Sequence, residues 1–267
     1  MSLKVTVNPF AEPVSRAEMK IHLRVDTTAD DELVDVLISA AREWSENFQN
    51  RSYVAQTFEL KMDYFPDVIE LPRSPLISVS SIQYVDADGD TQTFDASSYR
   101  VDSDSEPARI TPAYDDSWPD VRAVTGAVTV TFVAGYADKF TVTTSTNTCT
   151  ALGSTFTDGD LVRLHNSGGA LPVGLSAYTD YYIISVSGNT FQLSTASGGS
   201  AVDITEAGVG TDFVGLIPSA IVSALKLLCG HLYENRETVL VGVSANELPM
   251  GIKSLLSMDK VFQNADW

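Results

Sequence analysis

The sequence predicts an α+β fold: a helical core with a small antiparallel β region, plus an inserted all-β domain built as a barrel or a sandwich. Apolar residues recur with helical spacing at both ends of the chain, whereas short β-type runs separated by turn residues fill residues 54–134. A third segment, residues 139–215, is rich in Thr, Ser and Gly and has no helical period. Helices, strands, insertion and helices therefore follow one another in blocks, which is typical of α+β folds rather than of alternating α/β folds.

Two helices are predicted near the N-terminus, over residues 15–24 and 30–49. Ser15 and Glu18 have the spacing of a capping box, in which both side chains satisfy free backbone N–H groups at a helix start. In the second helix, acidic residues occupy the first turn, where the helix dipole favours negative charge. The apolar residues that recur along it every three or four positions are Leu33, Leu37, Ala40, Trp44 and Phe48.

The β region, residues 54–134, combines β-type runs with frequent prolines and glycines. The segment Asp86-Ala87-Asp88-Gly89-Asp90 separates two such runs, and its Asp-Gly pair is typical of a hairpin turn. In residues 127–134, the apolar Val128, Val130 and Phe132 alternate with threonines, and this period of two indicates a half-buried strand. Strands thus replace helices throughout this region.

Residues 139–215 are expected to form a self-contained β-rich accessory domain placed in a loop of the core. Short β-type runs alternate there with Gly-containing turns. Insertions of folded domains are best tolerated at exposed loops. The core is therefore expected to be discontinuous, with one part in residues 1–138 and the other in residues 216–267.

Helices return after the insertion, over residues 218–236 and 249–262. Pro218 suits the first position of a helix, because the N–H group of that position has no partner within the helix. The apolar residues that line one face of the first of these helices are Ile221, Leu225, Leu228 and Leu232. The second helix is amphipathic as well.

The charge balance restricts the function. Among 267 residues, 17 Lys and Arg stand against 35 Asp and Glu, and the net charge is −18 at pH 7. This charge repels a phosphate backbone, which argues against a DNA-reading protein but suits a surface that DNA passes without being held. No run of 18 apolar residues and no basic leader before an apolar stretch occurs, so we expect no membrane partner and synthesis in the cytoplasm.

We predict no catalytic residue, no cofactor and no metal site. His22, His165 and His231 lie in separate segments, and none has a partner at a metal-ligand spacing. The 86–90 segment departs from a calcium loop, because its Gly is fourth rather than sixth and no Glu stands at position twelve. The sequence also lacks the signatures of phosphoryl transfer, acyl transfer and dinucleotide binding. The chain is therefore expected not to be an enzyme.

Several segments outside the insertion resemble the head-tail connector family of tailed phages, whose members are also called adaptor or head-completion proteins. The most specific of them are Phe132-Val133-Ala134-Gly135-Tyr136, Gly230-His231-Leu232-Tyr233-Glu234-Asn235-Arg236-Glu237 and Glu247-Leu248-Pro249-Met250-Gly251. The insertion departs from the family pattern. In the family, a strand ending in Gly-Tyr leads within a few residues to the Pro-containing helix start, whereas here Asp138 and Ile217 flank the inserted segment.

The resemblance implies a structural virion protein made in the host cytoplasm. Such a protein forms a homo-oligomeric ring, commonly a dodecamer, in the virion neck between the portal protein and the stopper or tail-terminator proteins. It completes the head, provides the tail attachment platform and lets genomic DNA pass through its lumen without sequence-specific binding. A ring of this kind needs heterologous interfaces that close.

We predict portal or intersubunit contacts near the C-terminus. A polar patch at the end of the 218–236 helix suits an intersubunit contact, and the apolar face of the 249–262 helix suits either another chain or its own core equally well. The residues assigned to this contact are Glu234, Arg236, Leu248, Pro249, Ile252, Leu255 and Leu256.

A second class of function is a phage surface or adhesive protein whose β insertion binds carbohydrate. Its stacking surface would consist of Tyr178, Tyr181 and Tyr182. Tyrosines in strands more often fill cross-strand pairs, which favours the connector hypothesis.

Overall fold

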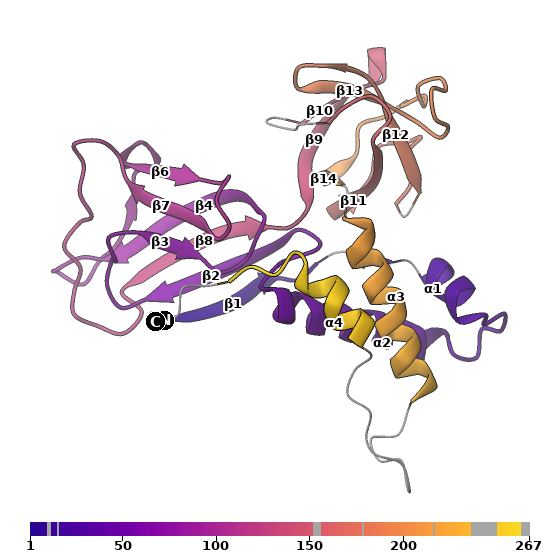
Figure 1. Cartoon of the computed structure of the whole chain (residues 1–267). Coiled ribbons are helices and arrows are strands. Elements are labelled where there is room, and N and C mark those ends of the chain that lie inside the picture. The colour runs from indigo at the N-terminus through magenta and orange to yellow at the C-terminus, as the bar shows by residue number, and fades with distance from the viewer. Residues whose placement is uncertain are drawn as a thin grey trace, which may run out of the picture. The chain divides into compact units, whose positions relative to one another are not determined.

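The chain divides into two compact units (Figure 1). Met1–Gly135 and Ser219–Trp267 form the first unit, and Tyr136–Pro218 form the second. Helices and antiparallel sheets occur in separate blocks, so the α+β prediction is confirmed. The structure is a computed structural model, and it describes residues 1–9, 12–14, 16–151, 156–177, 179–215, 217–235 and 250–262.

The helices of the first unit pack around α2. They are α1 (Arg16–Leu23), α2 (Asp31–Gln49), α3 (Ser219–Glu234) and α4 (Met250–Ser257). α2 contacts each of the other three. Its apolar stripe buries Val34, Ile38 and Ala41, while α3 buries its own stripe through residues such as Leu225 and Leu228. The stripe predicted for α2 was one position off: its residues Leu33, Leu37, Trp44 and Phe48 are half-buried and Ala40 is exposed. The predicted Ser15 cap of α1 lies outside the described residues.

The last helix is shorter than the predicted range 249–262, because α4 ends at Ser257. The chain beyond it turns along the C-terminal end of α2. There the Val261 N–H donates to the Gln49 carbonyl at 2.9 Å, and Asn50 Nδ2 donates to the Val261 carbonyl at 2.9 Å. Hydrogen bonds to a distant element therefore replace the last helical turns that the local pattern favours.

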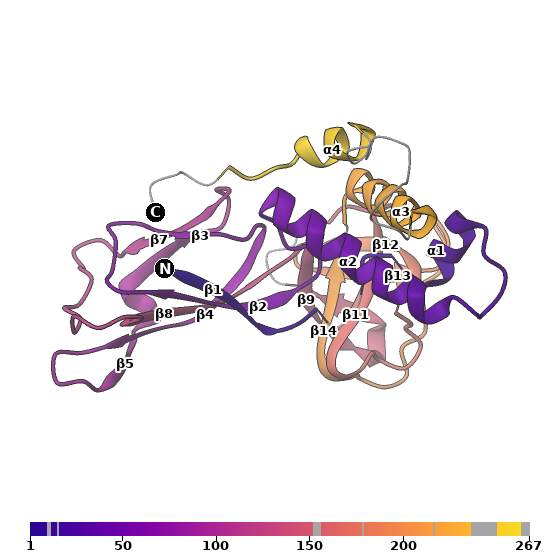
Figure 2. The same ribbon diagram turned by 90° about the horizontal axis from the view of Figure 1, so that it is seen from below.

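Two antiparallel sheets form a sandwich in the first unit, which Figure 2 shows as two layers. The larger sheet has the order β1-β2-β8-β4-β5, and the smaller one has the order β3-β7-β6. The strands of the larger sheet are β1 (Ser2–Val7), β2 (Gln56–Met62), β8 (Val128–Ala134), β4 (Leu76–Val85) and β5 (Thr91–Phe94). Those of the smaller sheet are β3 (Ile69–Leu71), β7 (Ala108–Pro112) and β6 (Tyr99–Asp102).

The sandwich core comes from the inward positions of both sheets. The buried side chains of this core are Phe58, Leu60, Met62, Ile69, Leu71, Ile82, Ala108, Ile110, Val128, Val130, Phe132 and Ala134. The predicted hairpin is present between β4 and β5, where Gly89 has a φ of 98°, a value that glycine adopts without strain. Gly135, at the end of β8, is also required, since a Cβ there would lie 2.6 Å from the backbone of Val54 and Ala55.

The second unit is a closed antiparallel barrel with the order β10-β13-β12-β11-β14-β9. Its strands are β9 (Ala137–Thr143), β10 (Thr148–Thr150), β11 (Leu161–Ala170), β12 (Asp180–Ser187), β13 (Thr190–Ser194) and β14 (Val209–Gly215). Buried residues such as Leu164, Ile183 and Phe191 fill its interior. Its first and last strands are paired, with Ala137 opposite Gly215, so the chain enters and leaves the barrel at one place.

Candidate functional site

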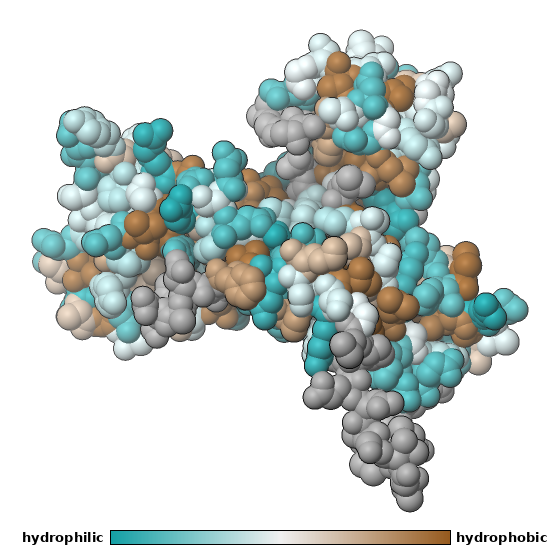
Figure 3. Space-filling view, viewed as in Figure 1, coloured by the Kyte–Doolittle hydropathy of each residue, from teal (hydrophilic) through white to brown (hydrophobic). Residues whose placement is uncertain are grey.

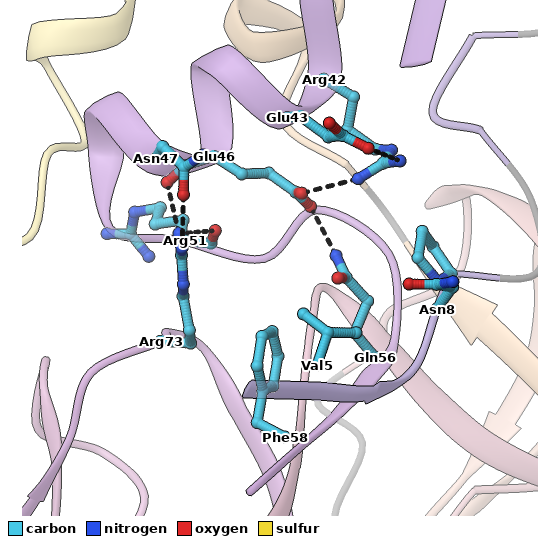
Figure 4. A pocket seen from close by; sticks show the side chains of 11 residues that line it. Val5, Asn8, Arg42, Glu43, Glu46, Asn47, Arg51, Gln56, Phe58 and Arg73 are labelled. Carbon is cyan, nitrogen blue, oxygen red and sulfur yellow. Dashed lines mark hydrogen bonds and ion pairs between the residues drawn. The ribbon is translucent and has the colours of Figure 1, made fainter. Parts of the chain in front are cut away.

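Buried polar side chains join the C-terminal end of α2 to the sandwich (Figure 4). Glu46 is at the centre. One of its carboxylate oxygens accepts from Arg42 Nη1 at 2.8 Å, and the other accepts from the Tyr53 N–H at 2.8 Å and from Gln56 Nε2 at 2.9 Å. Burial raises the pKa of Glu46 above its ordinary value, although Arg42 and the other donors oppose this effect. We call Arg42, Glu46, Tyr53 and Gln56 the polar joint.

Arg73 binds the same end of α2 from the loop between β3 and β4. Its Nη1 donates to the Glu46 carbonyl at 2.8 Å and to the Arg51 carbonyl at 3.3 Å, and its Nη2 donates to Asn47 Oδ1 at 2.5 Å. A cation at this position complements the negative end of the helix dipole. Burial lowers the pKa of Arg73, which remains a cation because an arginine titrates far above neutral pH.

A cavity of about 200 Å³ lies beside the polar joint. Its described lining consists of Val5, Asn8, Pro9, Arg42, Glu43, Glu46, Asn47, Arg51, Gln56, Phe58 and Arg73. This lining holds no Ser, Cys, His or Lys that would act as a nucleophile or as a base titrating near neutral pH. Its arginines donate to carboxylates and carbonyls of the chain itself. The arrangement therefore stabilises the joint between helix and sandwich.

The residues after α4 form a strap, residues 258–262, along the end of α2. Gln49 Nε2 donates to the Leu256 carbonyl at 2.7 Å, and Val261 is buried beside Gln49. Arg51 joins the strap to the loop between β6 and β7, since Nε donates to the Asp259 carbonyl while Nη1 donates to Glu106 at 2.6 Å. The strap is thus held by specific hydrogen bonds as well as by apolar contact.

Aromatic side chains gather where the strap meets α2. Trp44 and Phe48 stack with ring centroids 5.3 Å apart, and Lys260 Nζ lies 4.5 Å from the centroid of the Phe48 ring. Met258 is 69% exposed and Phe262 is 77% exposed. Figure 3 shows apolar surface over α4 and the residues that follow it. Exposed apolar and aromatic residues beside a cation are characteristic of protein contact surfaces.

The structure separates the residues that were predicted to make portal or intersubunit contacts. Ile252 is 1% exposed and Leu256 is 0% exposed, so both pack inside the first unit. Leu255 is half-buried, and Glu234 is exposed at the end of α3. Arg236, Leu248 and Pro249 lie outside the described residues. The periodic pattern identified an amphipathic helix, but it did not distinguish an apolar face turned inward from one turned outward.

The tyrosines considered for carbohydrate stacking do not form one surface. Tyr181 is 2% exposed and its hydroxyl accepts a hydrogen bond from the Ser176 N–H at 2.9 Å, so it belongs to the barrel core. Tyr182 is half-buried, and Tyr178 lies outside the described residues. The buried ring of Tyr181 cannot stack on a sugar.

Reactive groups are held in unreactive settings. Cys149 and Cys229 are free and buried, and burial raises their pKa values to about 12 and about 11, which keeps both thiols protonated at neutral pH.

In the part of the chain that the structure describes, no three His, Cys, Asp or Glu residues gather as metal ligands. None of the described helices is long and apolar enough to span a membrane.

Comparison with known proteins gives a family match over part of the chain. Residues 17–92 match the family model described as phage gp6-like head-tail connector protein. The predicted likeness to head-tail connector proteins is confirmed over these residues. This connector segment contains most of α1, all of α2 and strands β2 to β4, and it therefore includes the polar joint. Among curated proteins, no match was found.

Solved structures extend the likeness in fold to the whole chain. It is similar to a chain in the neck of an empty gene transfer agent (GTA) particle computed with C6 symmetry, with a TM-score of 0.57. Similar chains occur in the virion of a native GTA particle, with a TM-score of 0.56, and in the neck of a native GTA particle computed with C12 symmetry, with a TM-score of 0.54. In each case the identity is 18%, and the match covers 100% of this chain and 99% of the other. The likeness therefore includes the barrel.

Proposed function

We propose that this connector is a structural protein of the neck of a tailed phage or phage-like particle, where it forms a ring between the portal and the stopper or tail. The match to the connector family over residues 17–92 is the observation that carries this proposal. The chain-wide fold similarity to neck proteins supports it. A dodecamer is the proposed copy number, because twelve copies are compatible with both the C6 and the C12 symmetry of the similar structures.

The proposed ring completes the head and lets genomic DNA pass without sequence-specific binding. Residues 56–135 hold fourteen acidic side chains against five basic ones, although they make up less than a third of the chain. Acidic surfaces repel the DNA backbone and so prevent it from adhering to the wall of a channel. We assign acidic residues of the β region outside residues 113–120, such as Asp86, Asp88 and Asp90, to the DNA path for this reason.

The strap and the end of α3 are the proposed contact with the portal. Met258 and Phe262 supply the exposed apolar anchors, while Ile252 and Leu256 hold α4 on the first unit. Glu234 remains in the proposed contact because it is exposed, and Arg236, Leu248 and Pro249 remain in it as proposals from the sequence. A partner with an apolar groove would fit this surface.

A double variant tests the portal contact. We expect Met258→Asp combined with Phe262→Asp to fold normally but to join portal-bearing, tail-less heads at least about tenfold more weakly, since two exposed apolar anchors become charged. Val209→Asp is the matched control, because Val209 is an exposed apolar residue of the barrel. Joining is measured by sedimentation of heads with the bound protein. Undiminished joining by the double variant would refute the contact.

The barrel is the proposed accessory domain, inserted into the connector core for decoration or for contact with neighbouring proteins. Its paired first and last strands support an insertion, because both connections to the core leave from one place. A carbohydrate-binding role is disfavoured because Tyr181 is buried.

A further inference from the structure

The outer side of the larger sheet carries a surface of polar residues, five of which are serine or threonine. Register places Lys4, Glu59, Thr131 and Ser81 in one row across the strands β1, β2, β8 and β4. A second row, extending to β5, consists of Ser2, Lys61, Thr129, Gln83 and Thr93. We call these two rows the open face.

The open face lies on the side of the sheet opposite to the sandwich core. Side chains alternate along a strand, and the neighbours of these residues, such as Leu60, Val130 and Ile82, are the ones buried in the core. None of the open-face residues is buried. Figure 2 shows the smaller sheet on the other side of the larger one. Within the described part of the first unit, no helix makes extensive contact with these strands.

Charge distinguishes the open face from the rest of the chain. It holds two lysines and one glutamate, and Lys4 lies directly opposite Glu59 in the register. The remainder of a chain with a net charge of −18 is strongly acidic. Interface cores are depleted in charged residues, because charged groups and long flexible side chains are costly to desolvate and immobilise. Five of the nine open-face residues are threonine or serine, which lose little conformational freedom when they are covered, and the two lysines can pair with carboxylates of a partner.

A complementary surface is present elsewhere in the same unit. The turn after β7, residues 113–120, contains Asp115, Asp116 and Asp120, all exposed, and no basic residue. Tyr114 projects from this acidic turn and is 89% exposed. The base of the turn is anchored by Trp118, whose ring stacks on Phe65 with centroids 4.7 Å apart. The acidic turn thus presents an exposed aromatic residue and three carboxylates on a fixed support.

We propose that the open face binds the acidic turn of a second copy of this chain. The proposal rests on the proposed ring function, because a closed ring needs two different, complementary surfaces on every subunit. Tyr114 would lie on the threonines, and the aspartates would pair with Lys4 and Lys61. Charge attraction of this kind steers association and weakens with added salt.

Cysteine cross-linking tests this contact directly. Full-length protein with Lys61→Cys is mixed with full-length protein with Tyr114→Cys under mild oxidation. A covalent dimer is expected in the mixture and in neither protein alone, because each interface then holds one cysteine from each side. The native cysteines are buried and contribute little background. Lys139→Cys, at an exposed strand position of the barrel, replaces Lys61→Cys in the control mixture and is expected to give no dimer.

Charge reversal tests how much the pairing of Lys61 with the acidic turn contributes to ring assembly. Lys61→Glu is expected to raise the protein concentration at half-assembly about tenfold, as measured by native mass spectrometry, and Asp116→Lys in the same chain is expected to restore it. Lys139→Glu, with the same change of charge, is expected to have no effect. Rings that tolerate Lys61→Glu and give no cross-link would overturn the open face as an interface. If Lys61→Glu weakens ring assembly, Asp116→Lys does not restore it and no cross-link forms, the acidic turn is not the partner of the open face.

The wild-type chain separates this proposal from the proposed function. Its mass is measured alone and after incubation with portal-bearing heads. If the wild type forms rings while the cross-linking and charge-reversal results are negative, the neck function stands and the docking contact fails. If the wild type neither assembles nor binds the heads, both proposals fail.

Discussion

The sandwich of the first unit and the barrel of the second differ in whether their strands and sheet faces are all paired or covered within the same chain. The barrel pairs every strand with two neighbours, so it has no free sheet edge, and it encloses a core of its own. The sandwich ends in the edge strands β1 and β5, leaves the open face uncovered and depends on the polar joint for its attachment to the helices. A closed fold suits an accessory domain, whereas an incomplete one suits a subunit that is finished by its neighbours.

Truncations of buried core residues give the largest expected difference between the two units. Phe132→Ala, in the sandwich core, is expected to lower the free energy of unfolding of the first unit by about 3–5 kcal/mol and to leave the unfolding transition of the barrel in place. Phe191→Ala is expected to do the reverse, by a similar amount. Differential scanning calorimetry of both full-length variants checks this. If either change shifts both transitions equally, the barrel is not an independent inserted domain.

The polar joint provides the next test. Glu46→Ala leaves Arg42 buried beside fewer partners and the Tyr53 N–H without its acceptor, so we expect a loss of about 3 kcal/mol from the first unit alone. Glu43→Ala is the matched control on the same helix, because the Glu43 side chain is exposed, and it is expected to cost less than about 0.5 kcal/mol. Urea denaturation followed by tryptophan fluorescence measures both. Equal effects of the two variants would contradict the role given to Glu46.

The stability of the barrel is expected to depend on pH through one buried carboxyl group, with a smaller effect than the changes above. Asp212 is buried, and burial raises its pKa. Its folded-state pKa lies above its unfolded value, so its contribution to barrel stability is greatest at low pH and is lost as the pH rises through the folded-state pKa. Asn166 Nδ2 donates to the Asp212 carboxylate at 2.7 Å, while Asn166 Oδ1 has no partner among the described residues.

Asp212→Asn is therefore expected to stabilise the barrel by about 1 kcal/mol at pH 7, because it removes a buried charge and supplies a donor. The stability of the variant is expected to vary less between pH 4 and pH 7 than that of the wild type. Thermal unfolding at several pH values measures this, with Asp203→Asn, an exposed acid of the same domain, as the control. A variant with unchanged pH dependence would show that Asp212 does not carry it.

Periodicity predicted the parts of the fold in which local pattern and tertiary structure agree. α2 was predicted because its apolar residues repeat with helical spacing, although its buried stripe begins with Val34, Ile38 and Ala41, one position after the predicted Leu33, Leu37 and Ala40. The hairpin before β5 was predicted from its Asp-Gly pair. β1 was not predicted, although Leu3, Val5 and Val7 alternate with polar residues as in a strand; its pairing with β2 joins residues fifty or more positions apart. β6 and β7 are short, and the pairing of β7 with β3 depends on residues distant in the sequence.

The candidate contact surface was less predictable than the fold. Ile252 and Phe262 both belong to the predicted last helix, yet one is buried and the other is exposed. The difference arises because Gln49 and Asn50 bind the backbone of the chain around Val261, which ends the helix and turns the strap along α2. These bonds join residues more than 200 positions apart, so no local pattern contains them.

The pairing of Ala137 with Gly215 has a practical consequence for imaging the particle. Two chain ends that leave a domain side by side can accept another domain whose own ends are adjacent. A fluorescent protein placed between Gly135 and Ser219 would occupy the position of the barrel while the connector segment stays intact. Each neck would then carry one fluorophore per subunit, and counting bleaching steps in single particles would give the copy number without dismantling the virion.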